Sequence, residues 1–149
     1  MLTQRGEDLR LYLNGNLQFS SVDEYRYHEI LTHLPAAFTG QLQRALVIGG
    51  GDGLAVRELL KYPELQSVDV VDLDVAVTDL AKAQPQLTLL NNKSLSDQRT
   101  TIINADAWNW LAESGDLYDL ILIDLPDPES EEVAKLYSCL LYTSPSPRD

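Results

Sequence analysis

A glycine-rich run that contains one acid stands out as a place where side chains could do chemistry. It follows a short apolar stretch and comprises Gly49, Gly50, Gly51, Asp52 and Gly53. Strand-to-helix turns of this kind hold ligands in open parallel sheets, and glycine lets the backbone approach them closely. The turn alone is a weak signal, but the charge of Asp52 is more specific. A carboxylate there repels the pyrophosphate of a dinucleotide and pairs with a ligand that ends in an ammonium group.

The same charge ranks the nucleoside cofactors that could occupy the turn. Asp72 ends the next expected strand, where a carboxylate can accept hydrogen bonds from both ribose hydroxyls; its alternative role is to cap the following helix together with Asp74. Asp52 disfavours NAD and also S-adenosylmethionine, whose methionyl arm carries a carboxylate. Decarboxylated S-adenosylmethionine ends in a bare ammonium and therefore fits this pattern as a co-substrate.

A second acidic turn follows the last strongly apolar run. It reads Asp124-Leu125-Pro126-Asp127-Pro128, and its two prolines fix φ and stiffen the backbone. An amine that attacks carbon must be neutral, although its free pKa is about 10, so a nearby base has to remove a proton. Asp124 is the candidate base, and Asp127 is the candidate anchor for charge on the amine substrate. The alternative is a turn that only caps the next helix.

A third group of polar side chains lies near the start of an expected helix. Tyr27 could orient an amine by hydrogen bonding, and a neutral His28 could accept a hydrogen bond from an ammonium. A lone histidine in this position is also a common surface residue. Because neither His28 nor His33 has partners at metal-ligand spacing, the sequence predicts no metal site.

Alternating strand and helix patterns must position these groups. We expect strands at 45–48, 68–72, 100–104 and 118–124, and helices at 55–61, 74–83 and 107–113. This order predicts parallel strands joined by right-handed helical crossovers. The expected fold is therefore α/β, a partial doubly wound, Rossmann-like and methyltransferase-like sheet.

The remaining segments have weaker patterns. Residues 9–13 and 16–19 flank Asn14-Gly15, which predicts a β-hairpin with a type I′ turn ahead of the parallel sheet. We expect a helix over 23–34, ended by Pro35, with its apolar positions facing inward: Tyr27, Ile30, Leu31 and Leu34. The long polar stretch 84–98 is expected to be a surface loop.

Composition narrows the class of protein. The 149 residues include 23 acidic and 11 basic ones, and the net charge of −12 disfavours nucleic acid and attracts cationic small molecules, unless it only aids solubility. The apolar runs are short, no secretory signal opens the chain, and one cysteine cannot form an internal disulfide. We therefore expect a cytoplasmic protein.

The chain divides into three segments. Residues 1–35 form the hairpin and helix segment, and 36–138 form the Rossmann-like cofactor-binding domain. The final stretch 139–149, CLLYTSPSPRD, is similar to a translated sequencing adapter and is excluded from the fold. We expect the natural sequence to be cut at both ends, and a sheet with an unpaired edge to be inactive by itself.

Six stretches, taken together and in order, resemble the spermidine synthase family of polyamine aminopropyltransferases. They are LYLNGNLQFSSVDEYRYHE, VIGGGDG, VVDLD, NADAW, LIDLPDP and KLYS, and they cover residues 11–138. The resemblance implies transfer of an aminopropyl group from decarboxylated S-adenosylmethionine to putrescine or a related polyamine, without a prosthetic group. In that family Asp124 matches the proton acceptor.

The resemblance also assigns the other site residues. Asp52 and His28 match residues that contact the polyamine or the aminopropyl chain, and Tyr27 matches a tyrosine on the amine side. Asp72 matches the acid that holds the ribose, and Asp106 with Ala107 matches the adenine-binding position.

Two departures from the family pattern leave the acceptor amine open. Leu125-Pro126 replaces a pair of serines, and Ala107 replaces glycine. The DLPDP form looks like that of longer bacterial members with membrane helices ahead of this domain, so any membrane contact would come from helices missing here; a homodimer is also compatible. The rival interpretations are an S-adenosylmethionine methyltransferase and a non-catalytic protein that binds polyamines or nucleosides.

Overall fold

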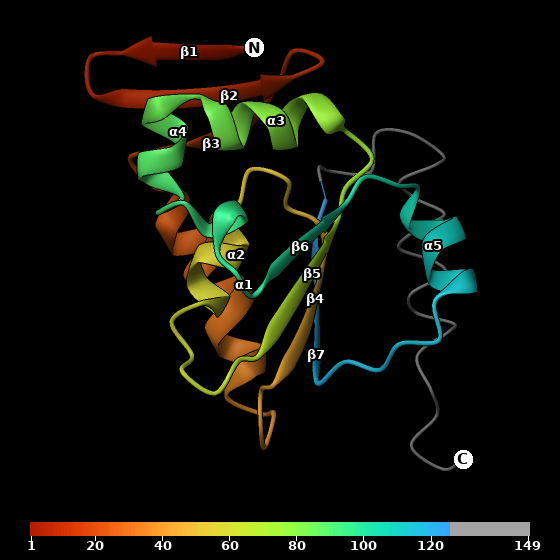
Figure 1. The fold of residues 1–149 in the computed structure, drawn as a ribbon. Helices are drawn as coiled ribbons and strands as arrows, with labels where there is room; N and C mark the ends of the chain where they lie inside the picture. The colour runs from red at the N-terminus through yellow and green to blue at the C-terminus, as the bar shows by residue number, and fades with distance from the viewer. Residues whose placement is uncertain (126–149) are drawn as a thin grey trace.

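Two β-sheets organise the described part of the chain, residues 1–125 of the computed structural model (Figure 1). A three-stranded sheet has the order β1-β2-β3, and a four-stranded sheet has the order β6-β5-β4-β7. Asp127 and the stretch 139–149 lie outside the described residues, so the predictions for them stay predictions.

The four-stranded sheet is parallel throughout. It comprises β4 (Arg44–Gly49), β5 (Ser67–Val71), β6 (Thr100–Ile103) and β7 (Leu120–Asp124). The chain runs from β4 outward to β5 and β6 and then returns to the other side of β4, which confirms the predicted doubly wound α/β sheet. The strand order thus reverses beside β4, where ligands bind in such sheets.

Helices cover both faces of this sheet. The helices α1 (Glu24–Ala36) and α2 (Leu54–Leu59) lie on one face, and α5 (Ala107–Glu113) lies on the other (Figure 1). The side chains of β4 alternate accordingly, because Val47 packs in the cluster that includes α2 whereas Leu46 and Ile48 pack with α5. Burial on both faces explains why β4 is continuously apolar in sequence. No helix within residues 1–125 is long and apolar enough to span a bilayer.

The N-terminal sheet contains the predicted hairpin and one additional strand. β2 (Asp8–Leu13) and β3 (Asn16–Ser20) are joined by Asn14 and Gly15, whose φ angles of 50° and 83° fit a type I′ turn. β1 (Leu2–Arg5) pairs antiparallel with β2 and was not predicted. Leu11 and Phe19 pack into the main core, which fixes the hairpin against the parallel domain.

The buried face of α1 differs from the prediction. The structure buries the positions Glu24, His28, Thr32 and Ala36, whereas the exposed fractions of Ile30 and Leu34 are 64% and 60%. The apolar periodicity was misleading because charged partners from neighbouring elements satisfy Glu24 and His28. Pro35 also lies inside the helix rather than after it, in the last turn, where its missing donor costs a single hydrogen bond.

The stretch 84–98 is a partly buried support and not the predicted surface loop. It contains α4 (Pro85–Leu90) and the short 3₁₀ helix η1 (Ser94–Ser96), and it follows α3 (Val75–Ala83). The buried Asn91 side chain donates to the carbonyl oxygens of Asp52 (2.9 Å) and Ala81 (3.1 Å). Ser94 Oγ donates to the carbonyl oxygen of Gly53 at 2.6 Å. Asn91 and Ser94 are therefore buried residues whose side-chain hydrogen bonds hold the backbone of the glycine-rich run in place.

Candidate active site

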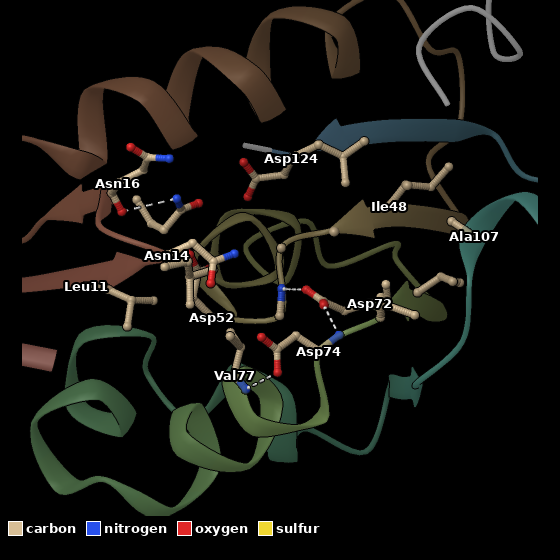
Figure 2. Close-up of a pocket in the computed structure, with 18 of the residues that line it drawn as sticks. Leu11, Asn14, Asn16, Ile48, Asp52, Asp72, Asp74, Val77, Ala107 and Asp124 are labelled. Carbon is tan, nitrogen blue, oxygen red and sulfur yellow. Dashed lines mark hydrogen bonds between the residues drawn. The ribbon is translucent and has the colours of Figure 1, made fainter. Parts of the chain in front are cut away.

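A cavity of about 890 Å³ opens at the carboxyl ends of β4, β5 and β7. The glycine-rich run and the residues that follow β5 form its floor, and the turn of the β2–β3 hairpin forms a further wall (Figure 2). Most of the side chains to which the sequence assigned chemistry line this one cavity: Tyr27, His28, Asp52, Asp72, Asp106 and Asp124.

The glycines of the run are required by close contacts within the protein itself. A Cβ on Gly49, whose φ is 76°, would lie 2.2 Å from the carbonyl oxygen of Asp124, and one on Gly51 would lie 2.4 Å from Asp72 Oδ2. Gly50 N–H donates to the carbonyl oxygen of Asp124 at 3.1 Å. The run is therefore packed tightly between the end of β7 and the carboxylate that follows β5, with no room for a larger residue at these positions.

Asp72 ties the glycine-rich run to the start of α3. Its Oδ2 accepts a hydrogen bond from Gly51 N and its Oδ1 accepts one from Asp74 N, both at 2.8 Å (Figure 2). The N-cap of α3 is Asp74, which accepts from Ala76 N at 2.9 Å, and Asp72 supports this cap by accepting from Asp74 N, so the alternative role at the start of α3 holds in part. Burial raises the pKa of Asp72. Its contact with a ribose stays a prediction.

Asp106 has a structural role that sequence reasoning missed. Its Oδ1 accepts hydrogen bonds from Trp108 N (2.8 Å) and Asn109 N (3.1 Å), which caps α5. The residue is exposed at the cavity beside Ala107 and Trp108. The cap fixes the backbone at the position where the family resemblance predicts that adenine binds, which stays a prediction.

Asp52 and Asp124 converge on the same part of the cavity from different elements. Asp52 lies in the glycine-rich run, where its Oδ1 accepts from Leu54 N at 2.9 Å, and Asp124 is the last residue of β7. Burial, and after it the nearby charge of Asp124, raise the pKa of Asp52 to about 7. These two carboxyl groups have oxygen atoms within 4.8 Å of each other and together favour the binding of a positively charged group.

His28 supplies positive charge to this pair, which corrects the prediction of a neutral acceptor. Its Nδ1 lies 2.8 Å from Glu24 Oε2 and its Nε2 lies 3.5 Å from Asp124 Oδ2, so both ring nitrogens face carboxylates. Burial alone would lower the pKa of His28, but the hydrogen bonds to Asp124 and Glu24 outweigh it and raise the pKa to about 10. His28 is therefore an imidazolium at neutral pH, in which Nδ1 donates to Glu24 Oε2 and Nε2 points toward Asp124.

His28, Asp52 and Asp124 form a cluster that could be considered as a metal site, because one possible ligand atom from each lies within 4.8 Å of the others. The family resemblance placed these three residues at one site, but the spacing in the sequence could not show their mutual contact, because they come from α1, the glycine-rich run and β7. Metal binding requires a neutral imidazole, whereas His28 is itself the cation of the cluster. A metal would have to displace the ring proton and the ion pairs of His28, and the absence of a metal stays a prediction.

Tyr27 lies beside this cluster with about half of its surface exposed. Its ring packs edge-on against the imidazole of His28, with ring centroids 5.0 Å apart. The structure thus brings the predicted amine-side residues together.

The hairpin wall is the part of the site that sequence reasoning missed. The turn and the start of β3 contribute Asn14, Asn16, Leu17 and Gln18 to the cavity. The Asn14-Gly15 signal predicted the hairpin but contains no information about what the hairpin faces. The amides of this wall add hydrogen-bonding groups opposite the glycine-rich run.

Comparisons with known proteins agree on one family. Residues 24–145 match the spermine/spermidine synthase domain. The chain is 50% identical over 143 residues to polyamine aminopropyltransferase 2 of Ralstonia nicotianae, covering 95% of this chain and 28% of the relative. It is 52% identical over 135 residues to polyamine aminopropyltransferase 1 of Streptomyces coelicolor, covering 91% of this chain and 25% of the relative.

Solved structures give the same result. A spermidine synthase in complex with the transition-state analogue AdoDATO superposes with a TM-score of 0.77 and 25% identity, covering 89% of this chain and 48% of that one. Spermidine synthase from Thermotoga maritima superposes with a TM-score of 0.73 and 25% identity, covering 83% and 47% of the two chains. The chain thus spans only part of the length of these proteins. It belongs to the spermine/spermidine synthase domain family.

Proposed function

We propose that the site transfers an aminopropyl group from decarboxylated S-adenosylmethionine to putrescine or a related polyamine, giving spermidine and methylthioadenosine. The observation that carries the proposal is the convergence of Asp52 and Asp124 on one cavity at the switch point of the sheet. The names of the relatives, and the transition-state analogue in the solved neighbour, support the same reaction. Membership of the spermine/spermidine synthase domain family is consistent with this reaction.

The nucleoside would lie along the glycine-rich run. Gly51 permits the close approach of Asp72 to the run, Asp72 can accept hydrogen bonds from the ribose through its remaining lone pairs, and the backbone at Asp106 and Ala107 would face the adenine. Hydrogen bonds within the protein already fix Asp72 and Asp106. Such preorganisation lowers the entropy cost of binding.

The aminopropyl arm would lie toward Asp52. Its terminal ammonium would pair with this carboxylate, whereas the carboxylate of S-adenosylmethionine would be repelled. Asp124 and Asp52 together make the region too negative for an anionic arm.

The reaction itself needs one proton removed from the attacking amine. We assign that proton to Asp124, with Tyr27 orienting the amine and Asp127 anchoring its distal charge. The nitrogen lone pair then forms the new bond to the propyl carbon next to sulfur, the carbon–sulfur bond breaks, and its electron pair stays on sulfur to leave a neutral thioether. Because a sulfonium is a good leaving group, most of the catalysis would come from positioning.

Location and assembly are proposed on the sequence alone. The small-molecule substrates favour the cytoplasm, and the resemblance to longer bacterial members favours anchoring through helices of a longer chain. A homodimer is compatible with the resemblance. Fractionation and light scattering of the protein would test these points.

Calorimetry with the two forms of the cofactor tests the proposed function. At pH 8 we expect decarboxylated S-adenosylmethionine to bind at least ~10-fold more tightly than S-adenosylmethionine, the factor that corresponds to one charged hydrogen bond. Because the pKa of Asp52 is raised to about 7, its carboxyl becomes neutral at lower pH, and the affinity for the decarboxylated form should fall as the pH drops through 7. Equal or tighter binding of the carboxylated form would contradict the proposal.

A further inference from the structure

A row of alternating charges runs from α2 to the end of β7 behind the cavity. This charge row consists of Arg57, Glu24, His28 and Asp124. Arg57 Nη1 donates to Glu24 Oε1 at 2.7 Å, and Arg57 Nη2 donates to Glu24 Oε2 at 3.1 Å. Glu24 Oε2 in turn accepts from His28 Nδ1 at 2.8 Å, and His28 Nε2 points at Asp124 Oδ2 from 3.5 Å.

Two members of the charge row, Glu24 and Arg57, do not reach the cavity. Glu24 and Arg57 are not among the described residues that line the cavity, and the Glu24 side chain is only 2% exposed. Arg57 is fixed further by donating to the carbonyl oxygen of Leu90 at 2.9 Å. Neither residue can therefore contact a substrate in the cavity.

The buried charge of Glu24 would lower the stability of the fold unless neighbouring groups compensated it. An isolated buried carboxylate is strongly destabilising, and even a paired one is often no more stable than an apolar replacement. Burial would raise the pKa of Glu24, but hydrogen bonds from His28 and Arg57 hold it below its ordinary value. The charge on Glu24 is thus maintained by Arg57 and directed at His28.

We propose that Glu24, held by Arg57, is a positioning residue that fixes the imidazole of His28 against Asp124 and provides the negative charge behind it. This inference rests on the proposed function, since it concerns the site of aminopropyl transfer. Asp52 and Asp124 repel each other, which helps raise the pKa of Asp52, and a positive His28 next to them opposes this rise and favours the carboxylate form of Asp52. The row therefore supports the two charges that the reaction needs.

Several charged groups face His28. Glu24 comes from the same helix, Asp124 from β7 and Asp52 from the glycine-rich run, while Arg57 reaches His28 only through Glu24. The Tyr27 ring packs on its edge. Replacing Glu24 by glutamine removes one carboxylate but keeps an acceptor of similar shape.

The direct test is the titration of the His28 ring, followed by NMR with ¹⁵N-labelled histidine. The pKa of His28, about 10 in the parent, should fall by ~1 or more in Glu24→Gln. The matched control is Glu58→Gln, which also removes a buried carboxylate bound to Arg57, but one whose other partners are His33 and Lys61. Glu58→Gln should leave the titration of His28 unchanged.

A pH profile of methylthioadenosine release by the full-length protein gives the functional readout. In Glu24→Gln the rate should fall as the pH rises through the lowered pKa of His28, whereas the parent should show no such limb below about pH 9. Glu24→Asp retains the charge and should restore protonation of His28. A merely structural role would instead lower the rate equally at all pH values.

Three results would overturn the proposal. One is a parent His28 that titrates near its ordinary value of about 6.5, a measurement that needs no variant and holds even if Glu24→Gln fails to fold. Another is an unchanged His28 titration in Glu24→Gln. The third is an equal shift in Glu58→Gln. The NMR titration requires no turnover, so its failure is distinguishable from failure of the proposed function, which would appear as a parent that releases no methylthioadenosine.

Discussion

Replacing Asp124 with asparagine is expected to lower kcat by about 10²- to 10⁴-fold, the range that general acid–base groups contribute. Asparagine has the same shape but cannot accept a proton at neutral pH. The backbone of residue 124 would keep its hydrogen bond from Gly50 N, so the glycine-rich run should stay in place. The loss should therefore appear in kcat of the full-length protein, measured as methylthioadenosine release at saturating substrates, with little change in the affinity for the nucleoside.

The matched control for this variant lies at the other end of the same strand. Asp119 immediately precedes β7 and accepts hydrogen bonds from the backbone of Gln43 and Arg44, far from the cavity lining. Asp119→Asn should keep these bonds and leave kcat unchanged. Equal turnover by Asp124→Asn and the parent would eliminate Asp124 as the base.

Replacing Asp52 with asparagine should weaken binding of decarboxylated S-adenosylmethionine by about 10- to 100-fold, the cost of losing a charged hydrogen bond. The same change should remove most of the discrimination against S-adenosylmethionine, because the repelling charge is gone. Asparagine can still accept the hydrogen bond from Leu54 N. Calorimetry with both ligands measures the two effects in one protein.

The same variant should be more stable than the parent at alkaline pH. The pKa of Asp52 is raised in the folded state, so the stabilisation from its bound proton is fully present below about pH 4 and is lost as the pH rises through 7. Asp52→Asn should accordingly raise Tm at pH 8 and have little effect at pH 4. Such a gain in stability at the expense of ligand binding is typical of functional sites.

Asp97 provides the control for the two calorimetric measurements, the affinity for decarboxylated S-adenosylmethionine and the discrimination against S-adenosylmethionine. Its Oδ1 accepts from Arg99 N at 2.9 Å, the same local bond that Asp52 makes with Leu54 N, but it does not line the cavity. Asp97→Asn should change neither the affinity nor the preference between the two ligands. If Asp52→Asn behaved like this control, the electrostatic account of cofactor selection would be wrong.

The fold was predictable wherever a local signal decided it. Asn14-Gly15 specifies a type I′ turn almost by itself, and the apolar run of β4 has to be buried on both faces. Asp124 ended an apolar run, so its place at the carboxyl edge followed from the parallel order. These features depend on neighbours in the sequence.

The parts that were not predicted depend on contacts between distant segments. The buried face of α1 carries Glu24 and His28 because Arg57 and Asp124 approach from other elements, and no periodicity within α1 can show this. The same contacts make His28 a cation. Asn91 resembled a surface residue until the structure placed its amide beneath the carbonyl of Asp52.

The central claim is that the aminopropyl group, and not the methyl group, is transferred from the sulfonium of decarboxylated S-adenosylmethionine. Incubating the full-length protein with decarboxylated S-adenosylmethionine and putrescine, and identifying the products by mass spectrometry, tests it most directly, because residues 1–149 alone are expected to be inactive. The account predicts methylthioadenosine and spermidine in equal amounts. Decarboxylated S-adenosylhomocysteine with a methylated amine, or binding of both substrates without any product, would contradict it.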